Sequence, residues 1–192
     1  NLQNGIRTSM LREYRKMIWS DWNPFRNVSP RIMIMAFAVC LLIPNIMYHK
    51  KLILKKYERW WLSGTLFWIF IILSATLIGR QVQAEPRKNL EFFWCLRLAL
   101  QTGKFRYWGD IIGNILLFVP LGLLIPLAFP QLSKLYIVFF CGMILSVSIE
   151  LIQYFARLGI LELDDIFHNT CGTVSGYLMY RGIWLIRNNL EN

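Results

Sequence analysis

Charged side chains are scarce in this sequence and almost missing from five long stretches of it. Only 17 % of the 192 residues are Asp, Glu, Lys or Arg, while 56 % are hydrophobic. An average soluble domain carries about 25 % charged residues and has fewer apolar ones. This scarcity of charge argues against an ordinary soluble domain and for a chain that places most of its length in lipid.

Motifs for covalent or metal chemistry are also missing. There are four cysteines without a C-x-x-C pair and two histidines, so no disulfide framework or zinc site is predicted. Three acids and His168 could hold a divalent cation, but no ligand spacing identifies one. No nucleophile motif accompanies the serines near His168. We therefore predict no cofactor, no metal and no catalytic residue.

The apolar residues are grouped in five runs of about 20 residues, the length of a helix that crosses the hydrocarbon core of a bilayer. We predict an all-α fold, a polytopic transmembrane helical bundle with about five spans and interfacial amphipathic segments. Residues 31–192 would form a single transmembrane domain. The predicted spans are 31–48, 62–79, 110–129, 135–156 and 166–186.

Two segments outside the runs suit the membrane surface. Residues 1–30 are basic and contain several aromatic residues, which is typical of an interfacial segment or of a flexible tail. Residues 89–101, NLEFFWCLRLALQ, predict a short surface helix in the longest connection. The net charge of +10 comes from residues that flank the spans. Membrane lipids are therefore the predicted partners of these cations, and nucleic acid is not.

The polar residues inside the runs share one depth. Because consecutive spans alternate in direction, the start of the third span, the end of the fourth and the start of the fifth lie on the same side. The fourth and fifth spans also carry polar residues at helical spacing, for example Ser146, Glu150 and Gln153. The candidate ligand-binding residues are Asn114, Glu150, Gln153, Arg157, Asp164, Asp165, His168 and Asn169.

Structural roles compete with binding at several of these positions. Amides and acids in spans often hydrogen-bond between helices, and Asp164 is suited to capping the fifth helix. Gly172 and Gly176 have the spacing of close helix packing. Glu150 lies about six residues inside its span, where an ionised carboxylate costs several kcal/mol unless it is paired or hydrated.

Two stretches carry a family resemblance. GNILLFVPLGLLIP (113–126) and SVSIELIQYFARLGILELDDIFHNTCGTVSG (146–176) resemble the VanZ-like family of bacterial membrane proteins. The family pattern falls on Asn114, Pro120, Gly122, Ser146, Glu150, Gln153, Asp165, Asn169, Gly172 and Gly176. The first span lies outside the shared region, and Glu91 and Phe92 depart from the family pattern before Phe93.

The resemblance implies a multi-pass protein of the bacterial cell membrane that acts as an accessory factor in tolerance to teicoplanin and related lipoglycopeptides. Its polar cluster would bind an amphipathic ligand, either the lipoglycopeptide or a cell-wall lipid precursor. The alternative is a membrane enzyme that uses Glu150 and Asp165 as acid and base on a lipid-linked substrate.

The orientation is predicted differently by two criteria. With the N-terminus outside, eight Lys and Arg lie inside and thirteen outside, so the positive-inside rule favours a cytoplasmic cluster. The family resemblance implies an outward-facing cluster. We follow the resemblance, because the interfacial segments at 1–30 and 81–108 raise the outside count.

Overall fold

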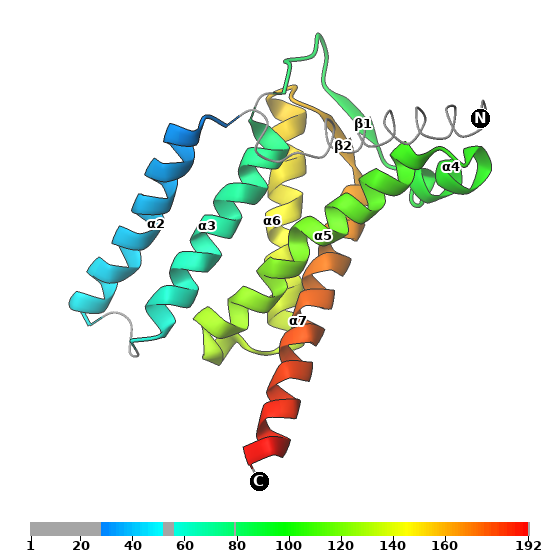
Figure 1. The fold of residues 1–192 in the computed structure, drawn as a ribbon. Coiled ribbons are helices and arrows are strands. Elements are labelled where there is room, and N and C mark those ends of the chain that lie inside the picture. The colour runs from blue at the N-terminus through cyan, green and yellow to red at the C-terminus, as the bar shows by residue number, and fades with distance from the viewer. Residues whose placement is uncertain (1–27, 52–55, 79, 192) are drawn as a thin grey trace, which may run out of the picture.

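The computed structural model describes residues 28–51, 56–78 and 80–191, and this part of the chain is almost entirely helical (Figure 1). Its five long helices run up and down in succession. The prediction of an all-α helical bundle is confirmed. Most of the predicted segment 1–30 lies outside the described residues. The long helices are α2 (Pro30–His49), α3 (Glu58–Leu77), α5 (Phe105–Ala128), α6 (Leu135–Phe155) and α7 (Leu163–Glu191).

Four of these helices, α2, α3, α5 and α6, are long and apolar enough to cross a membrane. At 29 residues α7 is the longest, but it is not among the four. The span predicted at 166–186 therefore lies on an observed helix, while its passage through the membrane stays a prediction. The 3-10 turn η1 (Pro130–Leu132) connects α5 to α6.

Glycines bring α5 and α7 into close contact at the centre of the bundle. A Cβ on Gly172 would collide with the backbone carbonyl of Ile115, and one on Gly176 would collide with that of Val119. Gly122 on α5 faces the α7 backbone in the same way. Small residues permit such close approach of helices in membranes. The predicted close packing at Gly172 and Gly176 is confirmed.

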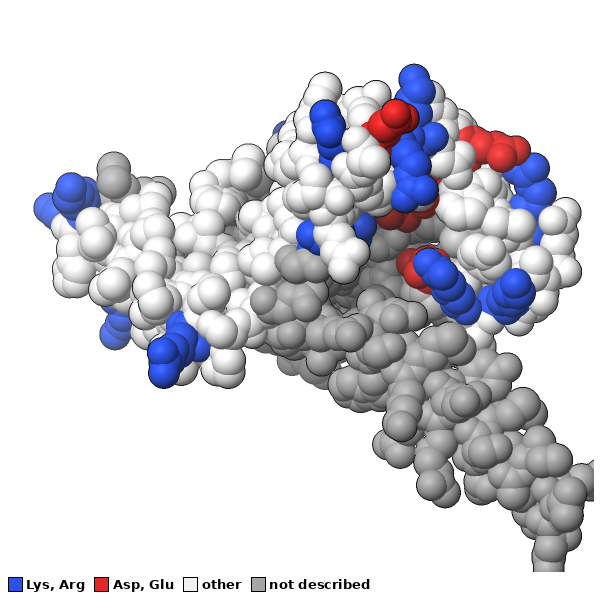
Figure 2. All heavy atoms as spheres, turned by 90° about the horizontal axis from the view of Figure 1, so that it is seen from above, with Lys and Arg blue, Asp and Glu red and all other residues white. Residues whose placement is uncertain are grey.

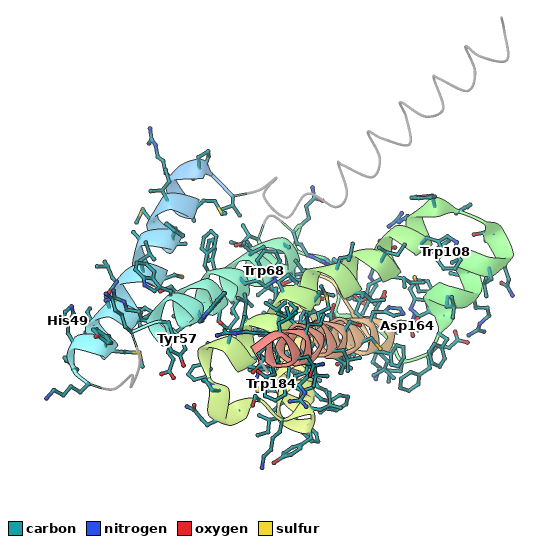
Figure 3. The ribbon with its side chains drawn as sticks, turned by 60° about the horizontal axis from the view of Figure 1, so that its bottom comes forward. His49, Tyr57, Trp68, Trp108, Asp164 and Trp184 are labelled. Carbon is teal, nitrogen blue, oxygen red and sulfur yellow. The ribbon has the colours of Figure 1, made fainter. Side chains whose placement is uncertain are left out.

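Helix α3 packs beside α5, and α2 lies on the outer side of α3 (Figure 1). The indole N–H of Trp68 donates to the carbonyl of Leu117 at 2.9 Å between α3 and α5 (Figure 3). Pro120 does not end α5, and Pro44 does not end α2. The shared apolar core consists of Ile72, Phe118, Leu121, Ile125, Val138, Ile149 and Tyr177.

The long connection after α3 contains the surface helix that the sequence predicts, α4 (Trp94–Thr102). It also contains strand β1 (Arg87–Asn89), which pairs in parallel with β2 (Ile160–Glu162). This two-stranded sheet was not predicted. It ties the connection before α5 to the turn between α6 and α7, and so closes one end of the bundle.

Candidate functional site

The predicted polar cluster lies at one end of the bundle. The end of α3, the start of α5, the end of α6 and the start of α7 meet there, together with α4 and the small sheet (Figure 1). This is the arrangement that the alternating direction of the spans predicts. The opposite end holds η1 and the C-terminal part of α7.

A cavity of about 660 Å³ is present at this end, within the range of about 300–1,000 Å³ typical of small-molecule sites. Figure 2, which looks onto this end, shows basic side chains around a hollow in which acidic side chains are visible. The wall is formed by Ala75, Thr76, Arg80, Gln83, Arg87, Trp94, Cys95, Arg106, Tyr107, Asp110, Asn114, Leu117, Gln153, Gly159, Ile160, Glu162 and Asp165.

Three of the predicted site residues line this cavity. The side-chain amide of Asn114 donates to the carboxylate of Asp165 at 2.7 Å, which joins α5 to α7. The amide of Gln153 donates to the backbone carbonyl of Thr76 at 2.9 Å. That carbonyl lies in the last turn of α3, where carbonyls have no partner within the helix. These amides therefore join helices and also face the cavity.

The charges of the cavity wall come mostly from residues that the sequence analysis did not select. They lie in connections and helix ends, where charge is equally typical of membrane anchoring, so no local pattern distinguishes them. Arg87 and Glu162 come to the same face only when β1 and β2 pair, because alternate residues of a strand share a face. The charged wall residues are Arg80, Arg87, Arg106, Asp110, Glu162 and Asp165.

Gly159 makes room for two of these wall residues. A Cβ at this position would lie 3.0 Å from Nη1 of Arg80 and 3.3 Å from Oε1 of Gln153. Any larger side chain would push these polar groups away from the turn. The glycine therefore lets a guanidinium and an amide approach the backbone between α6 and β2.

Glu150 supports the cavity wall and does not line it. Its side chain is only 2 % exposed, and its carboxylate accepts a hydrogen bond from the backbone N–H of Glu162 at 2.9 Å. The bond fixes β2 against α6. Glu150 is thus not among the residues that line the cavity, and its part in ligand binding stays a prediction.

Asp164 caps a helix, but a different one from the helix predicted. Its buried carboxylate accepts from the backbone N–H groups of Phe93 at 2.5 Å and Cys95 at 2.9 Å. These are N-terminal donors of α4, which have no partner within their own helix. Figure 3 places Asp164 at the start of α7 on the side of α4. Asp164 therefore holds the surface helix onto the bundle.

Arg157, His168 and Asn169 lie away from the cavity wall. Arg157 ends α6 with a φ of 57°, and its guanidinium donates to the carbonyl of Ala84 at 3.1 Å. His168 is buried next to the ring of Phe167. Asn169 donates to the hydroxyl of Ser146 at 2.9 Å, as an interhelical bond. Among the residues that the structure describes, no group of three or more His, Cys, Asp or Glu could hold a metal ion.

Glu162 is expected to make the stability of the protein depend on pH. Burial, together with the nearby carboxylates of Asp165, Asp110 and Asp164, raises its pKa from 4.5 to about 7. Because the folded state then binds the proton more tightly than the unfolded state, stability falls as pH rises from about 4.5 to about 7. We expect a thermal melt to show higher Tm at pH 5 than at pH 8.

Glu162→Gln should flatten this pH dependence of Tm, because glutamine cannot titrate. Glu91→Gln is the matched control, since Glu91 is an exposed acid that pairs with Arg97 at 2.7 Å. An equal slope of Tm against pH in the wild type and in Glu162→Gln would show that other groups cause the dependence.

The fold and the site together define a helical membrane protein with a charged cavity at one end of its bundle. The chain belongs to the VanZ/LLP1 family, whose model matches residues 60–187. It is 33 % identical over 79 residues to Protein VanZ of Enterococcus faecium, a match that covers 41 % of this chain and 47 % of that relative. The match thus spans about half of the relative's length. No solved structure matches the chain.

Proposed function

We propose that the chain is a multi-pass protein of the bacterial cell membrane that binds an amphipathic cell-envelope ligand in the cavity. Through this binding it would act as an accessory factor in tolerance to teicoplanin and related lipoglycopeptides. The cavity carries the proposal, because polar groups from several elements surround an open volume of about 660 Å³. A cluster that only joined helices would pack without such a space.

Two kinds of ligand suit a cavity at the end of a membrane bundle. A lipoglycopeptide and a cell-wall lipid precursor both combine a polar head with a long apolar chain. The head would occupy the charged cavity, while the chain would remain in the bilayer beside α3 and α5. The family membership and the similarity to Protein VanZ support a connection with the cell envelope.

The alternative, a membrane enzyme with Glu150 and Asp165 as acid and base, is less well supported by the geometry. Glu150 does not face the cavity, since its carboxylate holds the N–H of Glu162. Asp165 does line it, so these two carboxylates do not face the same space. Burial raises the pKa of Cys95, the thiol in the wall, to about 12, so this cysteine is a protonated and unreactive thiol at neutral pH.

The two functions predict different results for Glu150→Gln. Glutamine keeps an oxygen that can accept the bond from Glu162, so a protein that only binds should retain its tolerance. An enzyme that transfers protons through Glu150 should lose its activity. Tolerance is measured as the minimal inhibitory concentration of teicoplanin in a susceptible bacterium that expresses each variant, with the membrane level of the protein measured in parallel.

The cavity itself is tested by Asp165→Asn and Asn114→Ala in the same assay. We expect each to lower the tolerance given by the wild type at equal protein level. Arg97→Gln is the control, because Arg97 is an exposed residue of α4 that pairs with Glu91 outside the cavity. If both cavity variants keep full tolerance, the cavity is not the site of ligand binding. If the wild type gives no tolerance, the protein does not act against these antibiotics.

We also propose that the cavity faces the outside of the cell, where lipoglycopeptides and their targets are. Ala156, the exposed C-cap of α6, lies at the cavity end. In a background without the four native cysteines, Ala156→Cys should react with a membrane-impermeant thiol reagent on intact cells. A cysteine at Lys134, at the opposite end, should react only after lysis. The reverse pattern would place the cavity in the cytoplasm.

A further inference from the structure

Three arginines and the carboxylates of Glu162 and Asp165 line the same cavity without forming ion pairs with one another in the part of the chain that the structure describes. Within the described residues, no ion pair joins Arg80, Arg87 or Arg106 to Glu162 or Asp165. Arg87 instead donates to the side chain of Gln83 at 2.7 Å. Opposite charges that are close but unpaired keep their hydrogen-bonding capacity available for a bound molecule.

The arrangement of the small sheet puts the two signs of charge next to each other. Arg87 is the register partner of Ile160, and Asn89 is the partner of Glu162. Because alternate residues of a strand share a face, Arg87, Ile160 and Glu162 all point to the cavity, which agrees with the wall they form. The sheet thus presents a cation and an anion two residues apart.

The other charged residues of the wall come from separate segments of the chain. Arg106 lies in the first turns of α5, and Nη1 of Arg80 lies next to Gly159 and Gln153. Asp165 receives one hydrogen bond from Asn114 on its Oδ1 atom, which leaves its other oxygen able to accept. The cavity therefore offers guanidinium donors from three segments and carboxylate acceptors from β2 and α7.

We infer that the head group bound in this cavity carries both a phosphate and a primary ammonium. Arg80, Arg87 and Arg106 would bind the phosphate, and Glu162 and Asp165 would bind the ammonium. This inference rests on the proposed function, since it names the ligand class of the same site. It narrows the ligand from amphiphiles in general to phosphate-bearing lipids with an amine.

The phosphate and the ammonium each follow from the chemistry of the cavity wall. Three guanidinium groups offer more donors than one carboxylate can accept, whereas phosphate and pyrophosphate have enough oxygens. A site for an anion alone would not keep Glu162 and Asp165 in its wall, because they repel it. An ammonium supplies three donors to those carboxylates. Ala75 and Leu117 add apolar wall between α3 and α5, where the lipid backbone would lie.

Two membrane lipids have this chemistry, a phosphoethanolamine lipid and a polyprenyl pyrophosphate that carries an amine-bearing peptide. Binding is measured by native mass spectrometry on the purified full-length chain in dodecyl maltoside. The probes are dioctanoyl phosphatidylethanolamine, dioctanoyl phosphatidylglycerol, and a short prenyl pyrophosphate with and without the peptide. Tighter binding of the peptide-bearing pyrophosphate than of the ethanolamine lipid would identify the precursor as the source, and the reverse order would identify the glycerophospholipid.

We expect the amine-bearing member of each pair to bind roughly tenfold more tightly than its amine-free partner, as one charge-assisted hydrogen bond allows. Glu162→Gln or Asp165→Asn should reduce that preference while binding of phosphatidylglycerol is kept. Arg106→Gln should weaken the binding of both lipids of a pair. The control Arg97→Gln, which lies outside the cavity, should weaken the binding of neither. Monodispersity in size-exclusion chromatography verifies that each variant is folded.

Equal affinity within each pair would overturn the inference, as would equal weakening of both lipids by Glu162→Gln. Teicoplanin is measured in the same way as a separate probe. If teicoplanin binds and no phosphate lipid does, the inference is wrong and the proposed function stands. If no probe binds and the cavity variants keep full tolerance, the proposed function fails together with it.

Discussion

Gly176→Ala is expected to destabilise the bundle by roughly 3 kcal/mol, the upper part of the range for overpacking a close contact. The added Cβ would collide with the backbone carbonyl of Val119 on α5. A flexible side chain could move aside, but a helix backbone cannot move without separating α5 from α7. Both helices contribute to the cavity wall through Asn114 and Asp165, so we also expect loss of ligand binding.

The comparison is made with a second glycine of the same helix. Gly182 has nothing within 4 Å of the position of a Cβ, so Gly182→Ala should be neutral or stabilise by up to about 1 kcal/mol through helix propensity. Unfolding in detergent micelles, followed by tryptophan fluorescence, measures both variants. Similar effects of the two substitutions would mean that the close α5–α7 contact does not limit stability.

Asp164→Ala is expected to release α4 from the bundle at a cost of about 3 kcal/mol, because two hydrogen bonds to a charged group are lost and buried donors remain unpaired. The N–H groups of Phe93 and Cys95 would lose their acceptor. Hydrogen–deuterium exchange over residues 93–102 measures this directly. We expect protection of α4 to fall, while protection in the middle of α5 and α7 is largely kept.

Two variants make this prediction specific. Asp164→Asn retains one acceptor oxygen and should lose only part of the protection. Glu91→Ala removes the exposed ion pair of Glu91 with Arg97 of α4; since exposed pairs contribute about 0–1 kcal/mol, the protection of α4 should change little. If Asp164→Ala leaves exchange in α4 at the wild-type level, the docking of this helix depends on its apolar contacts through Cys95, Ala99 and Ile111 and not on the cap.

The helices and the location of the polar cluster could be predicted from the sequence, because both depend on local composition. Runs of about 20 apolar residues become helices in lipid, where every backbone polar group needs an internal partner. The alternating direction of such helices then brings Asn114, Gln153 and Asp165 to one end, and all three line the cavity. The glycine spacing likewise predicted the close contact of α7.

Which polar residues line the cavity and which only support its wall could not be predicted from the sequence. Glu150 and Asn169 have the same helical spacing as Gln153 and Asp165, yet they hydrogen-bond to Glu162 and Ser146 instead of lining the cavity. Which of these side chains meets open space depends on the rotation of each helix and on what packs over it. Spacing along one helix contains no information about either.

The sequence by itself determined a membrane bundle with a polar end, since hydropathy and periodicity act within single segments. Only the tertiary structure decided the charge of the cavity. Three-residue strands are too short to be recognised, and Arg87 and Glu162 are brought together by a parallel pairing of two strands that lie far apart in the sequence. Asp164 caps a helix about 70 positions earlier in the chain. Such contacts depend on the free energy of the whole packed end of the bundle, and no single segment specifies them.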